Sequence, residues 1–241
     1  SLKGPGSQHA PLFISLAVSI VAFAGTAAGQ QTRPEAASEG TRILHFPKSS
    51  RVIGSLFAYS PESPPRDVIN TPTDGEPLGR VSGDIAVPQG KLLLLLVGEQ
   101  GGRNPSCLSR LAPDDLYAVW FDKPWGSKIN PGDAILPHIT RLTGLRYLGI
   151  ANTNITAKGI KQLAKLPHLE RLALPHTITN QGLAEAIRLP SLKALGLRSG
   201  QITDQDVALL AGMPKLEELD LGGGEITDAS LAHLTRLPRL R

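Results

Sequence analysis

Hydrophobic positions in the second half of the chain recur with a fixed period. Apolar openings resembling "LPxLxxLxL" begin at Leu142, Leu166, Leu189, Met213 and Leu237, at spacings of 24, 23, 24 and 24 residues. Near-equal steps with matching apolar positions are the signature of an internal repeat, in which each copy forms one supersecondary unit. The chain therefore predicts a stack of similar units in its C-terminal half.

Each copy predicts a strand, a turn and a helix. Alternating leucines such as Leu172 and Leu174 have the period of a strand with one buried face. A polar turn with one isoleucine follows, and an apolar stripe then predicts a helix that ends before proline. Thr203 and Asp206 have the spacing of a capping box. Parallel, adjacent strands are expected to begin near Leu116, Leu145, Leu169, Leu192 and Leu216, with helices near residues 157–165, 180–188, 204–212 and 228–236.

These motifs resemble the leucine-rich repeat family. The pattern "LxxLxLxxTxITDxGLxxLxxLPxL" is similar to ribonuclease-inhibitor-like and cysteine-containing-type repeats without the cysteine, as found in exported bacterial repeat proteins. The resemblance covers residues 108–241. It implies an α/β solenoid with parallel strands on the concave side and helices on the convex side. The asparagine or cysteine that often ends the family's strand is replaced at Thr153, Thr177, Gly200 and Gly224, which puts a side-chain ladder there in doubt.

The start of the repeats is less regular. Leu116, Val119 and Phe121 indicate a first copy with an insertion that contains Trp125. Trp120 and Trp125 are interpreted as a cover for the end of the core, and a ligand platform is the alternative. Cys107, the single cysteine, is interpreted as an apolar core residue rather than a catalytic thiol.

The N-terminal half predicts three further segments. Residues 1–28 resemble a secretory signal peptide, because the apolar run from Pro11 to Ala24 precedes small residues; an uncleaved membrane anchor is the alternative. Residues 29–41 are expected to be a flexible linker. Residues 42–107 predict a small β-rich module that caps the solenoid, with an independent ligand-binding domain as the alternative.

The C-terminal end of the sequence also carries an expectation. "LPRLR" opens another copy and stops before its strand, so the solenoid of residues 108–241 is expected to be truncated there.

Charge and chemistry narrow the function. The formal net charge is +4, and lysine and arginine are scattered without a basic run, so the sequence does not indicate nucleic-acid binding. The histidines lack metal-ligand spacing, and the glycine-rich stretches lack the spacing of a phosphate loop. No catalytic residue, metal ligand or cofactor site is assigned, and the chain is expected to be a monomeric binding protein, not an enzyme.

The concave wall is the expected binding surface. Its outward positions include Tyr147, Arg171, Arg198, Glu218 and Asp220, which divide the wall into a cationic half beside Tyr147 and an anionic half. A simple ion pair between Arg198 and Asp220 is the alternative. The partner is expected to be a protein or a cell-surface polymer, met outside the bacterial cytoplasm. A regulatory or adaptor segment of a longer enzyme stays open, and an F-box-like relative is disfavoured by the signal peptide.

Overall fold

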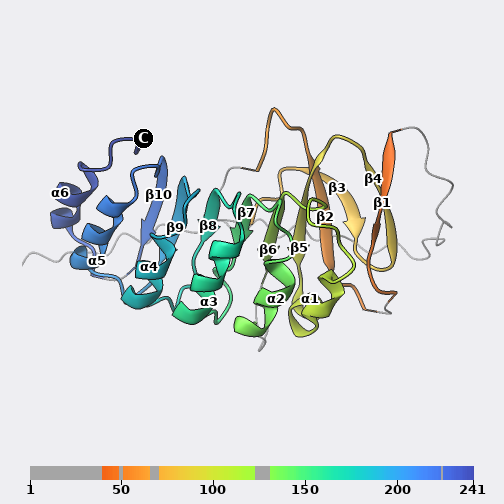
Figure 1. The fold of residues 1–241 in the computed structure, drawn as a ribbon, viewed down its shortest axis with the longest axis horizontal. Helices are drawn as coiled ribbons and strands as arrows, with labels where there is room; N and C mark the ends of the chain where they lie inside the picture. Colours follow the sequence, from red (N-terminus) through yellow and green to blue (C-terminus); the bar gives the residue numbers. More distant parts are fainter. Residues whose placement is uncertain (1–39, 49–50, 66–70, 123–130, 224) are drawn as a thin grey trace, which may run out of the picture. The chain divides into compact units, whose positions relative to one another are not determined.

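A computed structural model describes residues 40–48, 51–65, 71–122, 131–223 and 225–241. The predicted signal peptide, all but the last two residues of the predicted linker, and Trp125 lie outside the described residues. The described chain is a mixed α/β structure with a largely parallel sheet and helices (Figure 1). It belongs to one compact unit, residues 34–241.

The described strands and helices have the following bounds. The strands are β1 (Thr41–His45), β2 (Gly54–Tyr59), β3 (Glu76–Arg80), β4 (Asp84–Pro88), β5 (Leu92–Val97), β6 (Ala118–Phe121), β7 (Tyr147–Gly149), β8 (Arg171–Ala173), β9 (Ala194–Arg198) and β10 (Glu218–Gly222). The α-helices are α1 (Glu99–Arg103), α2 (Leu136–Ile139), α3 (Ala157–Gln162), α4 (Asn180–Ala186), α5 (Asp204–Leu209) and α6 (Leu231–Leu234). The 3₁₀ helices are η1 (Pro105–Leu108), η2 (Asp133–Ile135), η3 (Leu163–Lys165), η4 (Leu210–Gly212) and η5 (Asp228–Ser230).

One eight-stranded sheet contains all the repeat strands. Its order is β10-β9-β8-β7-β6-β5-β2-β3, and the steps from β5 to β10 are parallel. The predicted parallel order of the five repeat strands is confirmed, and the helices lie where the period predicts them, with α3 and α5 continuing into η3 and η4. Each strand begins two residues later than expected, because the first leucine closes a turn: Leu145 N–H donates to the Leu142 carbonyl at 2.9 Å.

The predicted β-rich segment contributes strands to two sheets. Two strands around a turn at Pro88 and Gly90 are predicted by the sequence of residues 78–98, and β4 and β5 lie there. They belong to different sheets, since β4 pairs with β1 in a separate two-stranded sheet, whereas β5 pairs with β2 and β6. Strand β3 begins at the end of the proline-rich stretch of residues 60–77, for which the sequence predicts a loop, and it pairs antiparallel with β2. Since β5 and β6 are hydrogen-bonded, the sheet runs through the predicted boundary at residue 107, and the division into two domains stays a prediction.

A single large core lies between the sheet and the helices. Strand residues Leu148, Leu172 and Leu195 pack in it with the helix residue Ile160, and all four are inaccessible to solvent. The same core reaches Leu56 of β2. Figure 1 shows α2 to α6 following one another along the repeat strands. The helices are short, so burial of one apolar stripe, rather than helix propensity, stabilises them.

Carboxylates join neighbouring copies at the starts of the helices. The Asp133 carboxylate accepts hydrogen bonds from the Thr156 N–H at 2.8 Å and the Thr156 hydroxyl at 2.6 Å. The Asp204 carboxylate binds the N–H and hydroxyl of Thr227 in the same way, at 2.9 and 2.6 Å. The predicted capping box is present, since Asp206 accepts from the Thr203 N–H at 3.0 Å. Thus Asp206 caps its own helix, whereas Asp204 holds the next copy.

Candidate binding surface

The two faces of the sheet have different neighbours. Successive side chains of a strand alternate between faces, so the repeat leucines point into the helix-covered core. On the opposite face lies a second apolar cluster of buried and partly buried strand and near-strand residues, to which no described helix contributes. This second face, called here the open face, is where the sequence placed its candidate binding residues.

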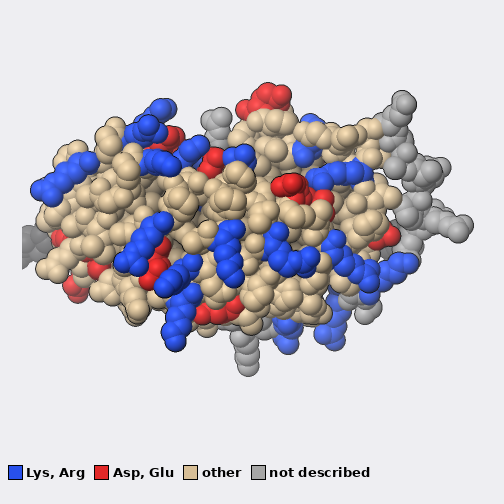
Figure 2. Space-filling model, in the orientation of Figure 1, with Lys and Arg blue, Asp and Glu red and all other residues tan. Residues whose placement is uncertain are grey.

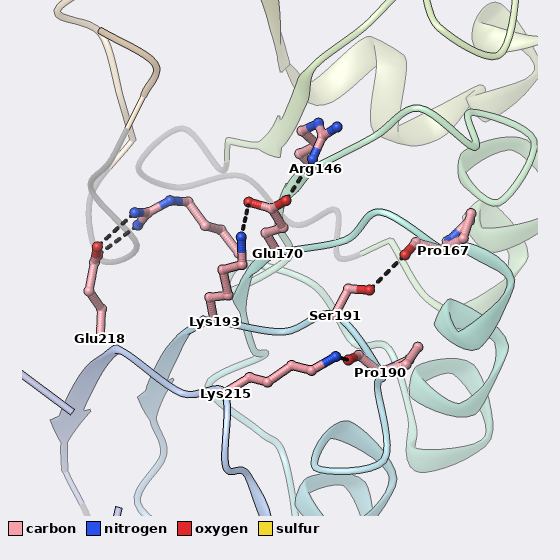
Figure 3. A network of polar contacts seen from close by, with 9 residues as sticks. Arg146, Pro167, Glu170, Pro190, Ser191, Lys193, Lys215 and Glu218 are labelled. Carbon is pink, nitrogen blue, oxygen red and sulfur yellow. Dashed lines mark hydrogen bonds and ion pairs between the residues drawn. The ribbon is translucent and has the colours of Figure 1, made fainter. Parts of the chain in front are cut away.

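A long-range ion pair crosses three strands of the open face. Arg171 on β8 donates to both carboxylate oxygens of Glu218 on β10, each at 2.7 Å (Figure 3). Arg171 and Glu218 are both in register with Ala194 of the intervening strand β9. Alanine is short enough to let the guanidinium pass over it, which makes the two-strand reach feasible. The hydrogen bond to Glu218 raises the pKa of Arg171, so its charge is permanent.

A second ion pair lies at the other end of these strands. Arg198 Nε donates to Asp220 Oδ2 at 2.7 Å, which confirms the simpler pairing that the sequence allowed. The two carboxylates each neutralise one of the two arginines. The predicted division of the wall into a cationic and an anionic half is therefore wrong, because the arginines reach across to the acids of β10.

Tyr147 does not occupy the position expected of an exposed anchor. Its side chain is only 1% exposed and packs edge-on against the Trp120 indole, with ring centroids 5.8 Å apart and an interplanar angle of 80°. The prediction that it projects from the wall as an exposed anchor is wrong, because Tyr147 is part of the buried apolar cluster on the open face. The Trp120 indole also lies over Gly149, where a β-carbon would overlap it. Trp120 therefore belongs to the second apolar cluster of the open face and not to the core between the sheet and the helices.

A polar network lies where the repeat strands begin. Glu170 accepts from Arg146 at 2.6 Å and from Lys193 at 3.2 Å, so one carboxylate connects three consecutive copies (Figure 3). Figure 3 also shows Lys215 and Ser191 reaching back to the carbonyls of Pro190 and Pro167, at 2.8 Å in each case. These contacts connect each turn to the one before it, and they stabilise the stacking of the copies.

Residues with reactive side chains are buried singly. The Cys107 thiol is buried, as the sequence indicated, and burial raises its pKa from 9.0 to about 11, which keeps it protonated at neutral pH. Burial also raises the pKa of Tyr117 and of Tyr59, and Asp74, which accepts a bond from the Tyr59 hydroxyl, adds to the second shift. Within the described residues, no three His, Cys, Asp or Glu side chains gather in an arrangement that would hold a metal ion. Every helix described is too short or too polar to span a bilayer.

The structure adds partners that sequence reasoning missed. The Arg171–Glu218 pair joins positions 47 residues apart, and the available signal was the alanine at position 194 between them. The Trp120–Tyr147 pair had a signal in the parallel register, which places consecutive strands' aromatic residues on one face. The five candidate binding residues are brought together as two ion pairs on β8 to β10 and one buried tyrosine on β7.

Comparisons with known proteins give a distant likeness. No protein-family model matches the chain, and no curated protein matches it. One similar solved structure is an internalin (inlF) from Listeria monocytogenes, with 20% identity over 56% of this chain and a TM-score of 0.37. Another is an internalin C2 (inlC2) from the same organism, with 22% identity over 65% of this chain and a TM-score of 0.39. The matches span 42% and 73% of those two chains. At these scores the α/β assignment rests on the strand order and register described above.

Proposed function

We propose that this chain is a leucine-rich repeat solenoid that acts as a non-catalytic, protein-binding module of an exported bacterial protein. The partner docks on the open face of β8, β9 and β10. The observation that carries the proposal is the pair of arginine–carboxylate contacts on a sheet face to which no described helix contributes. Repeated parallel strands hold such side chains at steps of about 4.8 Å, a rigid frame on which side chains can vary.

The exposed members of the two pairs would meet the partner. The side chains of Arg198 and Glu218 are 42% and 47% exposed, whereas Asp220 and Arg171 lie deeper. Each exposed member thus has one inner partner that fixes its rotamer. A pre-ordered arginine is favoured at binding hot spots because less side-chain entropy is lost on association.

Export is supported by the sequence of residues 1–28, whose apolar run and small residues are typical of a cleaved signal. Expression of the precursor in a bacterial host should yield an exported product whose mass places its start near Gly25 or Gly29. Intact precursor in the cytosol would contradict export without touching the binding proposal.

A charge swap tests the binding surface. In the double variant Arg198→Asp with Asp220→Arg, the ion pair is retained with reversed polarity. An exposed pair contributes only about 0–1 kcal/mol, so the melting temperature should stay within roughly 4 °C of the original. A protein cross-linked to the open face of the full chain and then purified should bind the swapped chain at least tenfold more weakly.

The matched control is Lys161→Glu, a charge reversal on α3 beyond the core. It should bind the same protein with unchanged affinity. Equal loss in the swap and the control, or no loss in either, would place the binding surface elsewhere. Unchanged binding by the swap alone would show that the pair is only structural.

A further inference from the structure

A row of basic residues lies on the helix side of the molecule. A buried apolar residue opens each copy, at Leu111 in the irregular first copy and then at Leu142, Leu166, Leu189, Met213 and Leu237. The residue before it is basic in five of these six cases: Arg110, Arg141, Lys165, Arg188 and Arg236, with Gly212 as the exception. The sequence spaces these residues 23 or more positions apart, and so they do not form a basic run. Parallel stacking brings equivalent positions of neighbouring copies side by side. The first four are called here the basic row, and all four are exposed.

The stacking of the row is visible in the contacts. Arg141 donates to the carbonyl of Ser109 at 2.9 Å, so it reaches the turn of the preceding copy that carries Arg110. In Figure 2, lysine and arginine side chains gather in a line that runs over the region of α4, α3, α2 and α1. Neighbouring packed helices lie about 8–10 Å apart, which gives the spacing of successive cations in the row.

Helix α3 widens the row at its centre. Lys158, Lys161 and Lys165 are spaced three and four residues apart, which places them on one face of the helix and its 3₁₀ continuation, and all three are exposed. The widened surface therefore follows both the stacking direction and the axis of α3.

Local acids do not neutralise this surface. Residues 131–193 contain eight Lys and Arg, of which Arg171 belongs to the open face, and only three Asp and Glu. Asp133 binds Thr156, Glu170 binds Arg146 and Lys193, and Glu185 lies 3.5 Å from Arg188. Among the described residues, the other basic side chains of the row and of α3 form no ion pair: Arg110, Arg141, Lys158, Lys161 and Lys165.

We infer that the basic row binds a linear polyanion whose charges are phosphate or sulfate groups. A line of cations suits a polymer more closely than a plane of lipid headgroups. The large hydrophobic residues exposed in the described chain are Leu209 and Leu231, which belong to α5 and α6, away from the row, so membrane insertion has no support there. Of the aromatic residues that the structure describes in the repeats, Trp120 and Tyr147 lie on the other side of the sheet, so they give the row no platform for stacking nucleic-acid bases.

The test measures affinity against salt concentration. The probes are inorganic polyphosphate and heparin, which represent the phosphate and sulfate sources, with oligo(dT) and phosphatidylglycerol vesicles as the alternative polyanions. Release of counterions from about four contacts predicts a log–log slope near −2.8, so affinity should fall about fifty-fold between 50 and 200 mM salt. The tighter of the first two probes identifies the source.

Matched variants locate the contact. Arg110→Gln with Lys165→Gln should weaken binding and reduce the salt effect to about sevenfold, because two contacts are lost. Arg80→Gln with Lys91→Gln removes the same charge from exposed positions at the end of β3 and just before β5, and should change nothing. Arg141→Lys keeps the charge and should also bind. All these positions are exposed, so circular dichroism should show an unchanged fold.

Three outcomes would overturn the inference. The first is no binding of polyphosphate or heparin at 50 mM salt. The second is tighter binding of oligo(dT) or vesicles than of either, and the third is equal loss in the Arg110/Lys165 and Arg80/Lys91 variants. The inference is independent of the proposed protein-binding function, because the Arg198/Asp220 swap should leave polyanion binding unchanged.

Discussion

Gly149 on β7 is the position where a single methyl group should have the largest effect on the open face. A β-carbon there would overlap the six-membered part of the Trp120 indole, far inside the 3.4 Å at which ordinary van der Waals contact begins. The overlapping atoms belong to a rigid ring that is 2% exposed, so the ring cannot simply turn into solvent. We therefore expect Gly149→Ala to destabilise the protein.

The magnitude follows from two terms. Overpacking a filled core costs about 1–3 kcal/mol. Displacing the ring also weakens the edge-on contact between Trp120 and Tyr147, and such contacts contribute about 0.5–1.5 kcal/mol. Together the terms predict a loss of about 1.5–4.5 kcal/mol in the free energy of unfolding, which corresponds to roughly 3–18 °C in melting temperature for a chain of this size.

Urea unfolding followed by circular dichroism measures this loss, and two further variants isolate its cause. Gly212→Ala adds a methyl group where nothing lies within 4 Å, so it should be neutral or stabilising by up to about 1 kcal/mol. Trp120→Leu removes the ring, and adding Gly149→Ala to it should cost less than 1 kcal/mol. If Gly149→Ala were as stable as the original, or cost the same with and without the tryptophan, the ring would not lie over Gly149.

Two other predictions concern the helix ends and the buried thiol. Hydrogen bonds from Ser230 and Thr227 lower the pKa of Asp204, so this carboxylate stabilises the last copy above its ordinary pKa of 3.8 and stops doing so as the pH falls through the lowered value. Asp204→Ala should speed hydrogen exchange of the Thr227 amide, and the control Asp228→Ala should leave it unchanged. Equal exchange in both variants would refute the contact. Because burial raises the pKa of Cys107 from 9.0 to about 11, the free energy of unfolding should begin to decrease as the pH rises above 9, below the range in which Tyr59 and Tyr117 contribute. Cys107→Ala should make this decrease smaller between pH 9 and 10 in urea titrations, and an unchanged decrease in that range would assign it to other groups.

The fold of the repeats was predictable because its signal is periodic. Leucines such as Leu172 and Leu195 recur at matching positions, and burial of one face fixes their register. The start of each strand was less predictable, since Leu145 and its equivalents are buried whether they end a turn or begin a strand. Strand β3 was missed because it begins within the proline-rich stretch of residues 60–77, and proline argues against a central strand. It is at the edge of the sheet, where proline is tolerated.

The candidate site was predictable in its residues but not in their contacts. Alternation along the strands placed Arg171, Arg198, Glu218 and Asp220 on the correct face. The alternation says nothing about how far a side chain extends, however. Arg171 extends over Ala194 and pairs with Glu218, which is two strands away. The prediction that Tyr147 is exposed was wrong for a different reason. Tyr147 is buried in the apolar part of the open face, where it packs against Trp120, which comes 27 residues earlier.

Both proposed surfaces arise from the same repeat but are separated by its core. The residues of the basic row lie in the helix-to-strand turns. The ion pairs are formed by strand residues that alternate with the buried leucines, so the row and the pairs lie on opposite sides of one apolar layer. A substitution at an exposed residue of either surface leaves the leucine layer intact, and effects of distant sites usually add. The two binding activities should therefore be removable one at a time, and a variant lacking both should still melt as one folded unit.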